Sequence, residues 1–109
     1  MAQNFRNQIV RNTGTSGVDI LNQVDSYDTV IGIRLANVHT ASISVDVYIV
    51  RSSTNYYLVK SAPIPVGGSL ELIDGGAKVV LASGDKIAAV STAANSLDTV
   101  VSYIDTIST

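Results

Sequence analysis

The feature that most constrains the fold is a succession of short runs rich in β-branched and tyrosine residues, which begins at Val18. Gly, Asn, Asp and Ser clusters interrupt these runs roughly every eight to twelve residues, as between the strands of an antiparallel sheet. β-branched and aromatic side chains fit a pleated, half-buried surface, whereas the interrupting residues favour turns. The pattern predicts about seven or eight short strands and indicates no helix.

Two segments show the alternation of a half-buried strand most clearly. Between residues 43 and 50 every odd-numbered residue is Ile or Val, so this face is expected to point into the core. Before it, Ile31, Ile33 and Leu35 share one face of a second strand. The connection of residues 37–41 is long enough for a hairpin loop, so we expect these two strands to pair.

The chain length of 109 residues and the 46% hydrophobic content predict a single domain with one core. Pro63 and Pro65 lack the N–H that a central strand donates, so residues 62–65 are expected at a sheet edge or a crossing. The strand spacing predicts a single antiparallel β-sandwich, either immunoglobulin-like or a small jelly roll, with a closed barrel as the alternative. With no Cys and no Trp, an immunoglobulin-like sandwich would share only the architecture of antibody domains.

The N-terminal segment differs from the rest in charge and pattern. The first 18 residues contain Arg6 and Arg11 and no acid, and they show neither helical nor strand periodicity for long. We therefore expect residues 1–17 to form an extended N-terminal arm and residues 18–109 the β-sandwich domain. The arm could add a strand to an exposed sheet edge of its own domain or of a neighbour, and a disordered tail is the alternative. In the arm, the residues expected to dock onto an acidic neighbour are Phe5, Arg6, Ile9, Val10 and Arg11.

Charge and hydropathy argue against two classes of partner. The net charge is −2 and the basic residues form no cluster, so nucleic acid is not expected to bind. Apolar runs such as residues 79–82 and 87–90 are far shorter than a membrane span, so no membrane partner is expected. Residues 1–12 lack the apolar stretch of a secretory signal peptide, which favours synthesis in a cytoplasm.

Candidate catalytic residues are few. The single histidine, His39, lies in a turn-like stretch, and without Cys the usual nucleophilic triads and zinc sites cannot be completed. Asp25 with Asp28, or Asp19 with Asp46, could pair as carboxylates for glycoside chemistry, but aspartates at strand ends usually bond nearby backbone. We therefore expect no enzyme activity, no catalytic residue and no cofactor.

Two loops offer oxygen ligands that a calcium ion could use, residues 74–76 (Asp-Gly-Gly) and residues 83–85 (Ser-Gly-Asp). Neither follows the spacing of a calcium-binding loop, so we interpret both as turns and expect no metal site. Tyr48, Tyr56 and Tyr57 could form a surface patch for a sugar or a protein, the alternative being ordinary core and sheet-surface tyrosines.

Several segments together carry a family resemblance. Residues 56–73 read YYLVKSAPIPVGGSLELI, residues 78–87 read KVVLASGDKI and residues 31–37 read IGIRLAN. With Asn4-Phe5-Arg6, they resemble small virion proteins of tailed bacteriophages, notably contractile-tailed phages of marine cyanobacteria. The shared features are hydrophobic and turn patterns and not a catalytic signature.

The resemblance implies a non-enzymatic structural protein of the virion, made in the host cytoplasm and acting through protein–protein contacts. A capsid decoration or cement protein is the leading expectation; the alternatives are a neck or tail accessory protein, or a receptor- or glycan-binding module. The expected partners are major capsid, neck or tail proteins and further copies of the chain. The 15% charged content agrees with a surface that is covered by a partner protein. Few charged side chains must then lose their hydration when the contact forms, so its desolvation cost is low.

Overall fold

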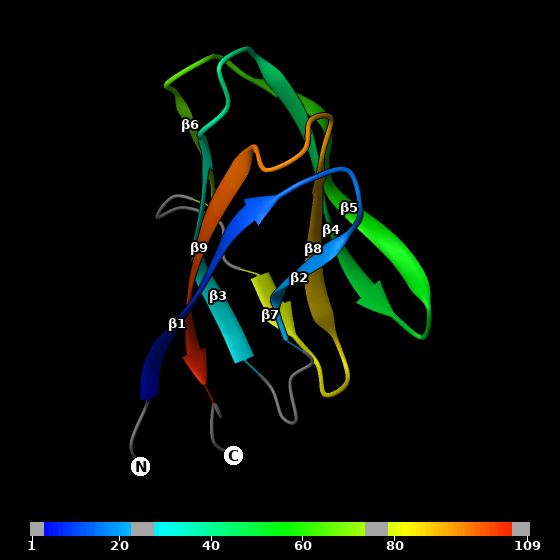
Figure 1. The fold of residues 1–109 in the computed structure, drawn as a ribbon. Helices are drawn as coiled ribbons and strands as arrows, with labels where there is room; N and C mark the ends of the chain where they lie inside the picture. Colours follow the sequence, from blue (N-terminus) through cyan, green and yellow to red (C-terminus); the bar gives the residue numbers. More distant parts are fainter. Residues whose placement is uncertain (1–3, 23–27, 74–78, 106–109) are drawn as a thin grey trace.

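A computed structural model describes residues 4–22, 28–73 and 79–105 of the chain. These residues form nine β-strands and no helix, so the prediction of an all-β sandwich is confirmed, with slightly more strands than expected (Figure 1). The strands are β1 (Asn4–Thr13), β2 (Val18–Leu21), β3 (Asp28–Asn37), β4 (Ile43–Arg51), β5 (Thr54–Ile64), β6 (Ser69–Ile73), β7 (Val79–Leu81), β8 (Lys86–Ser91) and β9 (Leu97–Asp105).

The strands form two antiparallel sheets that pack face to face. The first sheet has the order β1-β9-β3-β6, with β7 also paired to β3, and the second has the order β2-β8-β4-β5. The pairs are nested, because β1 pairs with β9, β2 with β8, β3 with β6 and β7, and β4 with β5. This nesting is the topology of a jelly roll, which decides between the two expected sandwiches and excludes the closed barrel.

The prediction that β3 and β4 pair as a hairpin is wrong. β3 pairs with β6, β7 and β9 in the first sheet, whereas β4 pairs with β5 and β8 in the second. The connection between them therefore crosses from one sheet to the other. The buried side chain of Asn37 supports this crossing by donating to the carbonyls of Ala41 and Ile64, both at 3.0 Å, and accepting from the His39 N–H at 2.8 Å.

Residues 4–13, assigned above to the arm, are extended and form the edge strand β1 of the first sheet, so this part of the arm adds a strand to its own domain. β1 pairs with β9 without a register shift from Asn4 to Val10. The chain then crosses to β2 beside the crossing from β8 to β9, where the Gly14 carbonyl accepts from the Ser91 N–H at 2.9 Å. A Cβ at Gly14 would lie 3.2 Å from Cα of Ala94, so glycine permits the close approach of the two crossings.

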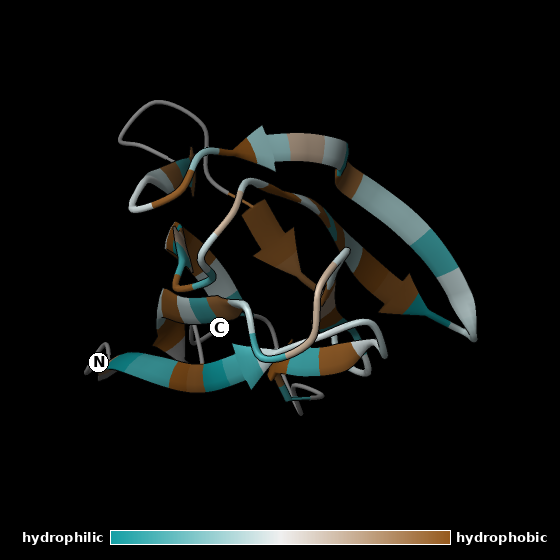
Figure 2. Cartoon of the chain, turned by 45° about the horizontal axis from the view of Figure 1, so that its top comes forward, coloured by the Kyte–Doolittle hydropathy of each residue, from teal (hydrophilic) through white to brown (hydrophobic). Residues whose placement is uncertain are grey.

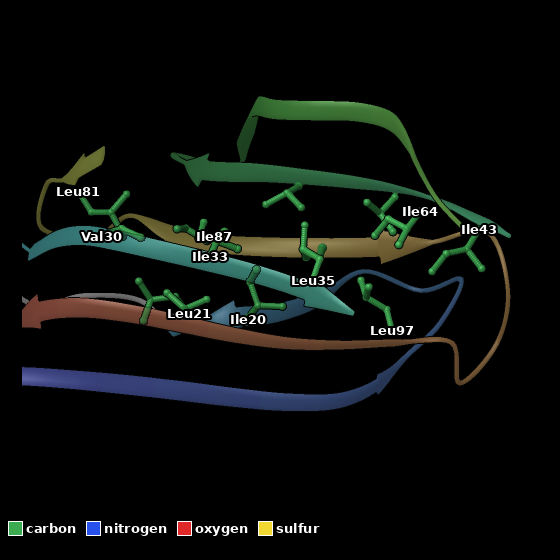
Figure 3. Packing of buried hydrophobic residues seen from close by; sticks show 14 residues of the cluster. Ile20, Leu21, Val30, Ile33, Leu35, Ile43, Ile64, Leu81, Ile87 and Leu97 are labelled. Atoms are coloured by element: carbon green, nitrogen blue, oxygen red, sulfur yellow. The ribbon is translucent and has the colours of Figure 1, made fainter. Parts of the chain in front are cut away.

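The core lies between the two sheets and is built mainly from Ile, Leu and Val (Figure 3). The alternation predicted for β4 is confirmed for Ile43, Val45 and Val47, which are buried. In β3, the expectation that Ile31 shares the buried face of Ile33 and Leu35 is wrong. Val30 is buried in its place and Ile31 is partly exposed, because a register shift against β9 between Val30 and Gly32 interrupts the alternation. Figure 2 shows the resulting alternation of hydrophobic and hydrophilic bands along several strands.

Candidate assembly surface

The first sheet exposes apolar side chains on the face that points away from the core. In β1, Phe5 is 68% exposed and Ile9 is 67% exposed. Their cross-strand partners on β9 are Ile104 and Val100, which are partly exposed. Since directly paired residues of an antiparallel ladder lie on the same face, these four side chains form one apolar surface.

The same surface continues across β3 to β7. Thr29 of β3 pairs with Ile104 on one side and with Val80 on the other, and Val80 is 57% exposed. A shallow hollow beside β1 adds Ile31, and its lining is Phe5, Arg6, Asn7, Ile31, Ser102 and Tyr103. We call the apolar residues of this face the outer face; they are Phe5, Ile9, Ile31, Val80, Val100 and Ile104.

Arg34, Glu71 and Asp98 are charged residues at the border of the outer face, and each is engaged locally. Arg34 of β3 pairs with Glu71 of β6, its register partner, with 2.9 Å between Nε and Oε1. The Asp98 carboxylate accepts from the Asn12 N–H at 2.9 Å. The outer face therefore offers contact area with few charges that must lose their water when it is covered.

The five residues predicted for the arm do not form one surface. Phe5 and Ile9 belong to the outer face, whereas Val10 packs against the core and Arg6 pairs across to Tyr103 on the opposite side of the sheet. Arg11 is exposed near the end of β1. The alternation of a β-strand explains this division, which an unstructured arm would not have.

The three tyrosines divide in the same way. Tyr48 of β4 and Tyr57 of β5 are register partners with ring centroids 5.2 Å apart, and Lys60 Nζ lies 4.5 Å from the centroid of the Tyr57 ring. Tyr56 pairs with Ile49 and therefore points to the opposite face of β5. The Tyr57 ring is thus engaged by Lys60 and Tyr48, and the three tyrosines do not form a common stacking platform.

The aspartates considered for catalysis take part in structural contacts where the structure describes them. Asp19 pairs with Lys86 (Oδ1 to Nζ, 3.2 Å), and Asp46 accepts from the Ser61 N–H at 2.7 Å. Asp28 is buried, and Asp25 lies outside the described residues, so that pair is not tested.

Of the two loops considered for calcium, the structure describes only residues 83–85, and residues 74–76 lie outside the described residues. In residues 83–85, the Asp85 carboxylate bonds to Arg51 and to the Ala82 N–H, which leaves it oriented toward protein donors. Within residues 4–22, 28–73 and 79–105, no group of three His, Cys, Asp or Glu side chains is placed to hold a metal ion.

Two comparisons with known proteins identify no relative of this chain. A scan against protein-family models gives no match to this chain, and a search of curated proteins finds none that matches. The part of the chain that the structure describes also contains no helix long and apolar enough to cross a membrane.

Sequence analysis missed four residues of the outer face: Ile31, Val80, Val100 and Ile104. A signal existed for two of them, because residues 97–107 alternate with apolar side chains on both faces, which indicates a strand covered on both sides. Val80 could not be found in this way, since the neighbourhood of β7 depends on its pairing with β3.

Proposed function

We propose that this chain is a non-enzymatic structural protein of a bacteriophage virion that decorates or cements the capsid through protein–protein contacts. The observation that carries the proposal is the outer face, where Phe5, Ile9 and Val80 are each more than half exposed on one side of a sheet. Large exposed apolar side chains gathered on one face are typical of an interaction surface. The major capsid protein is the proposed partner, with the neck or tail as the alternative location.

Two further arguments support this role. Jelly rolls recur in viral capsid proteins and in lectins, an analogy at the level of the fold. Between these two, the engagement of the Tyr57 ring by Lys60 and Tyr48 argues against a sugar-stacking platform at the tyrosines. The resemblance of residues 31–37, 56–73 and 78–87 to phage virion proteins favours the capsid.

The test is to find the chain in purified virions and to disturb its outer face. Mass spectrometry of gradient-purified particles should detect the chain at many copies per particle. Val80→Lys should weaken its rebinding to particles from which it has been stripped by roughly tenfold, since one exposed apolar contact is lost.

Val66→Lys is the matched control for this substitution. Val66 is exposed to 59%, close to the 57% of Val80, but lies in the turn between β5 and β6, outside the outer face. It should leave rebinding unchanged. Absence of the chain from purified virions would refute the proposed function.

A further inference from the structure

We propose that a second copy of this chain binds to the open edge of β1, so that the two β1 strands pair antiparallel about Asn7 and join the first sheets of both copies. The proposal rests on the assembly role argued above and names one partner for it. The interface contains Phe5 and Ile9, which the fold leaves largely exposed.

β1 is an open edge strand of regular geometry. Within the described residues it has a single paired neighbour, β9, and it lies at the margin of its sheet (Figure 3). The segment from Asn4 to Val10 contains no Pro or Gly and pairs with β9 without a shift. Along such an edge, alternate residues direct their N–H and C=O groups away from the sheet, which is a template for another strand.

The other edges are less suited to pairing. β5 carries Pro63, a charged Lys60 and a left-handed Ser61 (φ 56°), and its pairing with β4 is irregular. Proline, lysine and irregular geometry are features by which proteins protect sheet edges. β2, β6 and β7 have only four, five and three residues. β1 therefore offers the longest regular edge in the described structure.

The geometry of an antiparallel ladder restricts the register between two β1 strands. Residues whose backbone groups point outward alternate along the strand, so two copies related by a twofold axis must pair residues of the same parity. A twofold axis at Asn7, the middle of the regular segment 4–10, satisfies this condition and uses the whole segment. Asn7 then lies opposite Asn7 of the second copy.

This register makes the exposed side chains complementary. The segment 5–9 reads Phe-Arg-Asn-Gln-Ile, which has an apolar residue at each end and polar residues between them. Phe5 therefore meets Ile9 of the second copy, twice by symmetry, and Arg6 meets Gln8. Aromatic and β-branched pairs across strands are favourable, and no like charges lie directly opposite each other.

The symmetry of this segment is the reason to choose a second copy over an unrelated strand. A different partner could complement Phe5 and Ile9 with any apolar pair, but the segment already supplies its own complement on reversal. A twofold contact uses the same patch on both copies, so each residue is satisfied by another residue of the same patch.

The absence of cysteine from the chain allows a direct test by single-cysteine variants. Directly opposite residues of an antiparallel pair have Cα atoms about 4.5 to 5.5 Å apart, within the range that a disulfide spans. Asn7→Cys in the full chain should therefore form a covalent dimer under mild oxidation. Val80→Cys, which is also exposed but lies outside the interface, is the control and should form no covalent dimer.

A mixture of two variants tests the register. Phe5→Cys alone should crosslink poorly, because residues 5 of the two copies lie about 13 Å apart along the strands, four residues at about 3.3 Å each. Mixed with Ile9→Cys, it should give the heterodimer, which mass spectrometry identifies. Equal crosslinking of Asn7→Cys and Val80→Cys, or no preference for the mixed pair, would overturn the proposal.

Sedimentation of the unmodified chain gives an independent measurement. The wild type should dimerise with rising concentration, and Ile9→Lys should weaken the dimer by roughly a hundredfold, since both copies lose an apolar contact. Val80→Lys should leave the dimer intact while weakening particle binding, so the two proposals fail separately. A monomeric wild type, or a dimer indifferent to Ile9→Lys, would refute the β1 interface.

Discussion

The buried carboxylate of Asp85 accepts two hydrogen bonds from the guanidinium of Arg51, from Nε at 2.8 Å and from Nη2 at 2.6 Å. A third comes from the Ala82 N–H at 2.9 Å. The contact ties the end of β4 to the loop between β7 and β8. The hydrogen bonds from Arg51 are the main reason that the pKa of Asp85 lies below its ordinary value of 3.8, against the opposing effect of burial.

This contact should make stability depend on pH in the acid range. The pKa of Asp85 is lower in the native chain than in the unfolded chain, where it is about 3.8. Its contribution to stability is therefore complete above the unfolded pKa and is lost as the pH falls through the native pKa. Asp85→Asn should reduce the free energy of unfolding at pH 7 by about 2 kcal/mol. This is less than the cost of removing one partner from a fully buried ion pair, because the Arg51 guanidinium can return to water. Urea unfolding between pH 7 and pH 2.5 should show this difference closing in acid.

Asp19→Asn is the control for this prediction. It removes the ion pair between Asp19 and Lys86, whose side chains are 42% and 35% exposed. Such a surface pair should contribute less than about 1 kcal/mol. A difference between wild type and Asp85→Asn that stays constant into strong acid would contradict the prediction.

Replacing Asn37 should destabilise the crossing between the two sheets. Asn37→Ala removes three hydrogen bonds and leaves the carbonyl of Ile64 without its donor in a buried position. The expected cost is about 2 kcal/mol in the free energy of unfolding, measured by urea titration. Asn55→Ala, at an exposed position near the β4–β5 turn, should change stability by less than about 0.5 kcal/mol. Equal effects at the two positions would count against the assigned role of Asn37.

Replacing Thr99 should stabilise the chain. The Thr99 hydroxyl is buried on the inner face of β9 and has no hydrogen-bond partner among the described residues. Thr99→Val keeps the shape and removes a polar group that lost its water on folding, so a gain of about 1 kcal/mol is expected. Thr54→Val, at an exposed position, serves as the control in thermal unfolding. A lower melting temperature for Thr99→Val would show that the hydroxyl has a partner in solution.

The turn between β5 and β6 should require Gly67. Its φ is +72°, and the Gly68 N–H donates to the Pro65 carbonyl at 2.9 Å across the turn. A Cβ at Gly67 would meet nothing within 4 Å, so the cost of a side chain comes from the backbone alone. Gly67→Val should lose more than about 1 kcal/mol, and Gly67→Asn clearly less, because asparagine tolerates left-handed backbone. Similar losses for both variants would contradict this explanation.

Predictions based on local patterns agree with the structure in several places. The alternation of residues 43–47 identified a buried face, and Pro63 correctly placed its segment on an edge strand. The spacing of turns predicted the all-β sandwich. These features depend on side-chain alternation and on the missing proline N–H, both of which are properties of a few neighbouring residues.

The pairing of distant segments was not predictable in the same way. Residues 4–13 contain too few apolar side chains to indicate a strand, yet they form β1, because β9 supplies backbone partners from the other end of the chain. The hairpin expected between β3 and β4 does not exist for the corresponding reason, since each strand finds its neighbours elsewhere.

By itself, the sequence determined the class of fold, the positions of most strands and the small number of charges on the surface. Only the tertiary structure decided that the sandwich is a jelly roll, that β1 forms an edge of the first sheet and that Phe5, Ile9 and Val80 share a face. The physical reason is that β-sheet hydrogen bonds join residues far apart in sequence, so strand order and shared faces depend on contacts that no local pattern encodes.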